Sequence, residues 1–208
     1  MATKAVRNAF APEPVNALIQ AQQQPEFGNI MSFLGARGSV PQVRFSDYGN
    51  PKFSTNNLLY GGDLPAAGVV SLPPTSDANA VMHEFTHAAD RQIGQLSLEI
   101  GNKPARKRTP LENQFMAAYD KLRYSAQAFN TDPAKLPREQ MASRLGPEWA
   151  AKNKDYRAQV GELSAWGMGN MAGPGPERPA PLHLDPTMAT EFSILLELAN
   201  RLQQQRKE

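Results

Sequence analysis

Residues 76–94 read SDANAVMHEFTHAADRQIG, and this stretch decides how the rest of the chain is interpreted. Ser76 or Asp77 can cap a helix, and apolar residues then recur at the spacing of one helical face. Two of the chain's 3 histidines, His83 and His87, stand four residues apart within it. Because positions i and i+4 share a face of a helix, both imidazoles can bind one metal ion.

The glutamate after the first histidine can act as a general base beside the metal. Glu84 flanks the metal rather than binding it, so it can take a proton from a water that the metal holds. Zinc lowers the pKa of such a water toward about 7, so a carboxylate is an adequate base at neutral pH. The pattern predicts a zinc-dependent hydrolase with Zn2+ as its cofactor. Two surface histidines without metal, or a zinc site without activity, are the alternatives.

A catalytic zinc needs a third protein ligand and an open fourth position. The helix of His87 offers no further histidine, which leaves carboxylates as candidates. If this helix continues, Glu99 lies about 18 Å farther along its axis, which is out of reach. Glu112 ends the sequence Thr109-Pro110-Leu111-Glu112, which is typical of a capping box at the start of a helix.

Glu162 is the favoured third ligand. Ala158 and Ala165 share its helical face, and small residues there let that helix approach the zinc helix closely. An ordinary surface glutamate is the alternative. Asp90, three residues after His87, is predicted to support a ligand imidazole from the second shell, since such carboxylates orient histidine ligands. Asp90 as a direct ligand is the lesser interpretation.

Residues 83–90, HEFTHAAD, resemble the HE-aromatic-x-HA-x-D segment of the zincin metallopeptidases, and more narrowly the gluzincins. In gluzincins a glutamate on a later helix completes the zinc site. Residues 156–166, YRAQVGELSAW, are similar to the Tyr…Glu-x-x-Ala-aromatic pattern of the anthrax lethal factor-like branch. The resemblance implies that Glu162 binds zinc and that Tyr156 stabilises the transition state. The layout also resembles phage-encoded metallopeptidases.

The resemblance further implies an edge strand above the zinc helix that holds an extended substrate by main-chain pairing. That strand would consist of Val69, Val70, Ser71 and Leu72. A buried structural strand is the alternative. His183, in a proline-framed loop, is a candidate to stabilise the oxyanion, with an ordinary surface role as the alternative.

The remaining sequence predicts an α+β fold, a mostly helical zincin-like domain with a small N-terminal sheet. Residues 1–40 are expected to form a helical arm or extension, and residues 41–208 the metallopeptidase domain. A strand is expected at residues 43–48. The last helix should begin at Pro186, after the N-cap Asp185, and carry a core-facing leucine stripe. A partner-binding helix is the lesser interpretation of that stripe.

The composition limits partners and location. A net charge of +2 argues against a nucleic-acid binder, and the basic clusters at residues 103–108 and 201–207 are interpreted as solvated. The chain has no cysteine, no signal-like N-terminal run and no stretch of about 20 apolar residues. A soluble protein, cytoplasmic or virion-associated, is expected. A polypeptide, or a peptidoglycan peptide, is the expected substrate.

The rival function is a non-catalytic structural or interaction protein, such as a virion component, that retains the fold. Its partner would bind through the N-terminal arm or the C-terminal helix.

Overall fold

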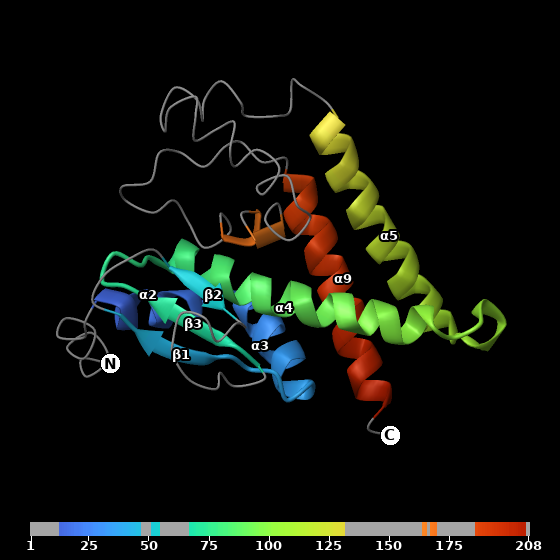
Figure 1. Ribbon diagram of the computed structural model, residues 1–208, viewed down its shortest axis with the longest axis horizontal. Coiled ribbons are helices and arrows are strands. Elements are labelled where there is room, and N and C mark those ends of the chain that lie inside the picture. The colour runs from blue at the N-terminus through green and yellow to red at the C-terminus, as the bar shows by residue number, and fades with distance from the viewer. Residues whose placement is uncertain are drawn as a thin grey trace.

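The computed structural model describes residues 13–46, 51–54, 67–131, 164–165, 167–169 and 186–206. These residues form a mostly helical α+β fold with a small sheet, as predicted (Figure 1). The helices and strands follow the order α2 (Glu13–Ala21), α3 (Pro25–Ala36), β1 (Gln42–Phe45), β2 (Lys52–Ser54), β3 (Val69–Leu72), α4 (Ala78–Gly101), the 3-10 helix η2 (Ala105–Lys107), α5 (Pro110–Thr131) and α9 (Pro186–Gln205). No described helix is long and apolar enough to span a bilayer.

The sheet has the strand order β1-β3-β2, with β1 parallel and β2 antiparallel to β3. The prediction that Val69–Leu72 forms the edge is therefore wrong, because this strand is the central one and all four of its residues are buried. Its main chain pairs with a strand on each side, so it has no free edge to offer a substrate. Strand β2 was not predicted, since three residues after Pro51 are too few to show an alternating pattern.

Helix α4 carries the HEFTH segment through the middle of the molecule. Of the two predicted cap residues, Ser76 and Asp77, it is Asp77 that caps the helix, and its side chain accepts a hydrogen bond from the Ala80 backbone N–H at 2.7 Å. The helix contacts β2 and β3 and is crossed by α9 toward its other end (Figure 1). Its Phe85 ring packs edge-on against Phe27 of α3, with centroids 5.0 Å apart. The helix is thus held on several sides, which fixes the direction of its side chains.

Helices α2 and α3 belong to this same core. Helix α2 packs against α4, and α3 packs against both α4 and α9. Their apolar side chains are buried together with those of α4, among them Ala21, Phe27, Ile30 and Phe33. The helical character predicted for this region is confirmed. The boundary predicted at residue 40 is not seen in the packing, because residues 13–36 share one core with the later helices.

Helix α9 closes the core from the C-terminal side, and it begins at Pro186 as predicted. Its apolar stripe is core rather than a free docking face, because Phe192, Leu195, Leu196 and Leu202 are all buried. Helix α5 packs along α9. The C-terminal helix therefore packs against both α3 and α5.

Residues 164–165 and 167–169 are helical and lie over the first half of α4 (orange in Figure 1). Gly169 meets the first turn of α4 so closely that a Cβ there would lie 2.7 Å from the Asn79 Oδ1 and 3.0 Å from the Asn79 carbonyl oxygen. The close approach to α4 is therefore made at Gly169, whereas it was predicted at Ala158 and Ala165. Ala165, one helical turn earlier, is fully buried.

This contact predicts the effect of adding one methyl group. We expect Gly169→Ala to lower the free energy of unfolding by about 1–3 kcal/mol, because the methyl group overpacks against both the side chain and the carbonyl oxygen of Asn79. Gly94 is the control, since a Cβ there meets nothing within 4 Å. Gly94→Ala should raise stability by about 0.5–1 kcal/mol through helix propensity. Urea denaturation of both variants checks this, and equal stabilities would contradict the close contact.

Candidate metal centre

His83 and His87 lie one turn apart on α4, and their rings meet in a T-shaped arrangement. The two Nε2 atoms are 3.1 Å apart, the ring centroids are 4.7 Å apart and the ring planes are nearly perpendicular at 87°. His83 is buried and His87 is half-buried. The Nε2 atoms of the two side chains therefore approach each other on one face of the helix.

This geometry fits zinc. Two Zn–N bonds of about 2.0–2.1 Å at a tetrahedral angle would separate the nitrogens by about 3.3–3.4 Å. The observed separation of 3.1 Å needs a shift of only a few tenths of an ångström to match. In metal-free protein the same separation suits an N–H···N hydrogen bond between the rings. The same arrangement of the two rings thus suits either a hydrogen bond between them or a cation bound by both.

Glu84 lies beside the histidines and points to the sheet. Its Oε2 accepts a hydrogen bond from the backbone N–H of Phe53, in β2, at 2.6 Å. The residue is only 7% exposed, so the carboxylate sits in a protected position between α4 and the strand. No sequence pattern predicted this contact, because β2 is short and Phe53 lies 31 positions before the glutamate.

Asp90 follows one turn later on α4. Burial raises the pKa of its carboxyl group, while the nearby charge of His87 opposes that rise. Among the residues that the structure describes, no three His, Cys, Asp or Glu side chains form a group able to hold a metal ion. Asp90 therefore does not join the pair of histidines as a direct ligand, and its predicted supporting role remains a prediction.

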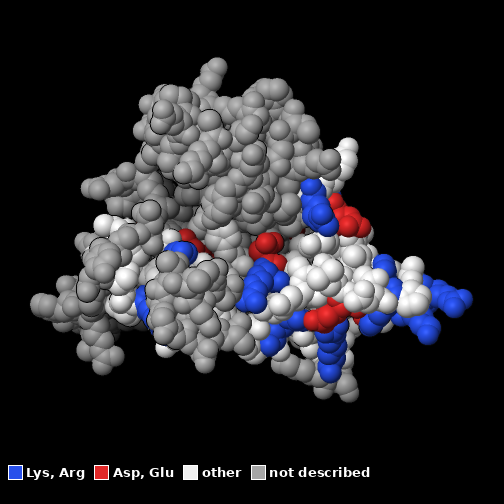
Figure 2. All heavy atoms as spheres, viewed as in Figure 1, with Lys and Arg blue, Asp and Glu red and all other residues white. Residues whose placement is uncertain are grey.

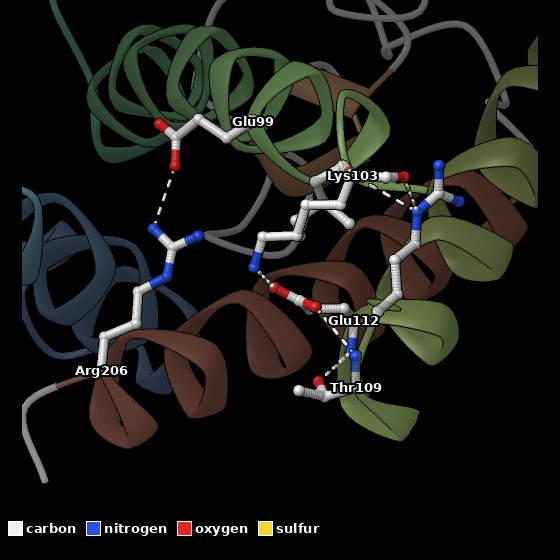
Figure 3. Close-up of polar contacts among 7 residues, drawn as sticks. Glu99, Lys103, Thr109, Glu112 and Arg206 are labelled. Carbon is white, nitrogen blue, oxygen red and sulfur yellow. Dashed lines mark hydrogen bonds and ion pairs between the residues drawn. The ribbon is translucent and has the colours of Figure 1, made fainter. Parts of the chain in front are cut away.

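Glu99 has the structural role that its distance along the helix suggests. Helix α4 continues to Gly101, and the Glu99 carboxylate forms an ion pair at 2.6 Å with Arg37, the residue after α3. It forms a second ion pair at 3.0 Å with Arg206, after α9 (Figure 3). The hydrogen bond from Arg37 is the main reason why the pKa of Glu99 is lowered. Glu99 therefore ties three helices together away from the histidines.

The lowered pKa of Glu99 predicts a pH-dependent contribution to stability. A carboxyl group whose pKa is depressed on folding stabilises the native state above its unfolded value of about 4.5, and loses this effect as pH falls through the folded value. We expect Glu99→Gln to destabilise the protein by under about 1 kcal/mol at pH 7, because the side chain is partly solvated. The difference from wild type should shrink as the pH falls below about 4.5 and vanish once the pH is below the folded-state pKa. Urea denaturation at a series of pH values from about 7 to about 3 measures it.

A suitable control for that experiment is Glu197→Gln, since Glu197 is exposed on α9 and no ion pair is seen for it within the described ranges. A Glu99→Gln effect that stays constant between pH 7 and pH 3 would contradict the ion-pair explanation.

The predicted capping box at the start of α5 is confirmed. The Thr109 N–H donates to Glu112 Oε2 at 2.9 Å, and the Glu112 N–H donates to Thr109 Oγ1 at 3.1 Å. Lys103 pairs with the other oxygen of Glu112 (Figure 3). Burial alone would raise the pKa of Glu112, but the hydrogen bonds from Lys103 and Thr109 outweigh it and lower the pKa. Glu112 is thus occupied as a helix cap.

Part of the basic cluster at residues 103–108 holds the turn between α4 and α5. Figure 2 shows this turn as a group of Lys and Arg side chains at the right end of the view, with acidic residues nearby. Arg108 donates to the carbonyl oxygens of Ile100 and Gly101 at the end of α4. Arg106 and Lys107 are exposed. The cluster therefore serves in part to close the C-terminus of α4.

The remaining predicted site residues, Tyr156, Glu162 and His183, lie outside the described residues. Comparisons with known proteins assign the chain to no family, because no family model, no curated protein and no solved structure matches it. The resemblance to zincins thus rests on the two sequence segments that carry it. Of the predicted site, the structure brings together His83, Glu84 and His87.

Proposed function

We propose that this chain is a zinc-dependent metallopeptidase in which His83 and His87 bind the metal and Glu84 is the general base. The observation that carries the proposal is the convergence of the two Nε2 atoms, 3.1 Å apart, with a buried carboxylate on the next residue. Two imidazoles and an adjacent glutamate on one helix are what a zinc hydrolase requires.

A bound zinc ion would supply Lewis-acid chemistry, by acidifying water and polarising the scissile carbonyl. Glu84 accepts the proton of the attacking water and passes it to the leaving amine. Its sheltered position favours this role, since electrostatic interactions are stronger where water is excluded. Tyr156 or His183 would then stabilise the negative charge that develops on the carbonyl oxygen.

Glu162 remains the proposed third ligand. Gly169 contacts Asn79, and Asn79 lies one turn before His83 on α4, so this segment approaches the face that carries the histidines. Positions 162 and 169 are seven apart in sequence, which is the spacing of one helical face. A carboxylate on that face is the group that a gluzincin-like site needs.

The third-ligand assignment predicts the behaviour of Glu162→Ala. We expect its zinc affinity to fall by more than about tenfold, since even the loss of an outer-shell partner costs 10- to 100-fold. Competition with a chromophoric chelator measures the affinity. Glu197→Ala, on the exposed side of α9, is the control and should bind zinc like wild type. Unchanged affinity in Glu162→Ala would show that another group completes the site.

The function itself is tested by metal analysis and hydrolysis. Purified protein should hold one zinc per chain and cleave a labelled unfolded polypeptide. Chelation should abolish cleavage, and added zinc should restore it. Protein that binds no zinc, or binds zinc and cleaves no polypeptide or peptidoglycan peptide, would favour the rival function of a non-catalytic structural or interaction protein.

A further inference from the structure

The hydrogen bond between Phe53 and Glu84 joins the edge of the described sheet to the proposed general base. Phe53 pairs with Val70 in the antiparallel ladder. Its N–H donates to Glu84 Oε2 at 2.6 Å, so it points away from β3. In an antiparallel pair such outward N–H groups alternate with those that bond the partner strand. The contact with Glu84 therefore uses a donor that the sheet leaves available.

The donor is held in a fixed place. Lys52 and Ser54, on either side of Phe53, pair with Ser71 and Val69 of the central strand. The Phe53 ring lies directly on Gly68, where an added Cβ would be 2.6 Å from the ring atom Cε2. Gly68 also has a φ of +86°, which side chains rarely adopt. Main chain and side chain thus both anchor Phe53, while α4 anchors Glu84.

We propose that the main-chain N–H of Phe53 is a positioning group for Glu84. By holding Oε2, it fixes the plane of the carboxylate and therefore the direction in which Oε1 points. A backbone donor suits this task, because a hydrogen bond to a charged acceptor is strong and the donor has no rotamer freedom. This inference rests on the proposed function, since it assigns the orientation of the base in that reaction.

The size of the expected effect follows from the geometry of proton transfer. A general base must lie within hydrogen-bond reach of the proton that it takes. Loss of its anchor lets the carboxylate rotate, and a misplacement of about 1 Å costs on the order of 10²-fold in rate. We therefore expect kcat to fall by about 10- to 100-fold without the Phe53 N–H. KM and zinc content should stay near their wild-type values, because the N–H donates to Glu84 and is assigned no contact with substrate or metal.

The matched pair Phe53→Pro and Phe53→Ala tests this. Both variants lose the ring, but only proline loses the N–H, and proline is tolerated where an edge N–H does not bond the sheet. The expected result is a kcat about 10- to 100-fold lower in Phe53→Pro than in Phe53→Ala, with KM and zinc content equal. If Phe53→Pro does not fold, phenyllactate at position 53 keeps the ring and replaces the N–H by an ester oxygen. Equal kcat values, or a higher kcat without the N–H, would overturn the proposal.

A second measurement does not depend on activity. In zinc-free wild-type protein the Phe53 amide should exchange with deuterium at least about tenfold more slowly than in Glu84→Ala, because the hydrogen bond must open first. Equal exchange rates would overturn the positioning role. Should the wild-type protein bind zinc but hydrolyse nothing, the proposed function fails, while amide exchange still decides whether Phe53 holds Glu84.

Discussion

Replacing His87 with alanine is expected to remove zinc and all hydrolysis. The remaining imidazole of His83 cannot hold the ion in place. We expect the affinity for zinc to fall by more than about a hundredfold, since the loss of an outer-shell partner alone can reduce it that much. His87 is the better of the two positions to replace, because it is half-buried whereas His83 is 6% exposed. Alanine at position 83 would also leave a cavity.

The loss should also appear as a loss of zinc-dependent stability. A ligand at a thousand times its Kd stabilises the folded state by about 4 kcal/mol, which is on the order of 10 °C in Tm for a domain of this size. Wild-type protein should show this rise on adding zinc, and His87→Ala should not. His183→Ala is the control, since the third histidine is not assigned as a ligand. A His87→Ala protein that still binds one zinc tightly would contradict the site.

Replacing Glu84 with glutamine is expected to abolish most of the activity while zinc stays bound. An amide cannot accept the proton of the attacking water, and general-base catalysis contributes about 10²- to 10⁴-fold. KM and zinc content should change little. Glutamine is the informative substitution, because its side-chain oxygen can still accept the hydrogen bond from the Phe53 N–H, so the fold around β2 is retained.

The measurement is kcat and zinc stoichiometry for Glu84→Gln beside wild type. Activity that survives the substitution would assign the proton transfer to another group, even if zinc binding is confirmed. Activity lost together with zinc would mean that Glu84 has a role in building the site, and the general-base assignment would then be unsupported.

Local patterns in the sequence were sufficient for much of the helical structure. A cap at Ser76 or Asp77, the capping box formed by Thr109 and Glu112, and the start of α9 at Pro186 were all predicted, because each depends on residues within one turn of the helix end. The distance of Glu99 from the histidines was predicted only for a helix that continues past Gly94, and α4 does continue, to Gly101. The ion-pair partners of Glu99 were not predicted, because Arg37 and Arg206 lie far from it in sequence.

Long-range packing decided the rest. The central position of Val69–Leu72 depends on β1 and β2, and sequence periodicity does not reveal which strands pair. The same holds for residues 13–36, whose helices could be predicted but whose place in the core could not. The hydrogen bond from Phe53 to Glu84 joins a three-residue strand to α4, and no spacing rule connects them.

That His83 and His87 share a face, with Glu84 beside them, follows from their spacing alone, because a helical turn brings residues four apart together whatever surrounds it. The 3.1 Å approach of the two Nε2 atoms and the hydrogen bond from a distant strand to the carboxylate depend on how the chain folds. Those distances depend on packing around α4, and packing is set by contacts between residues far apart in sequence.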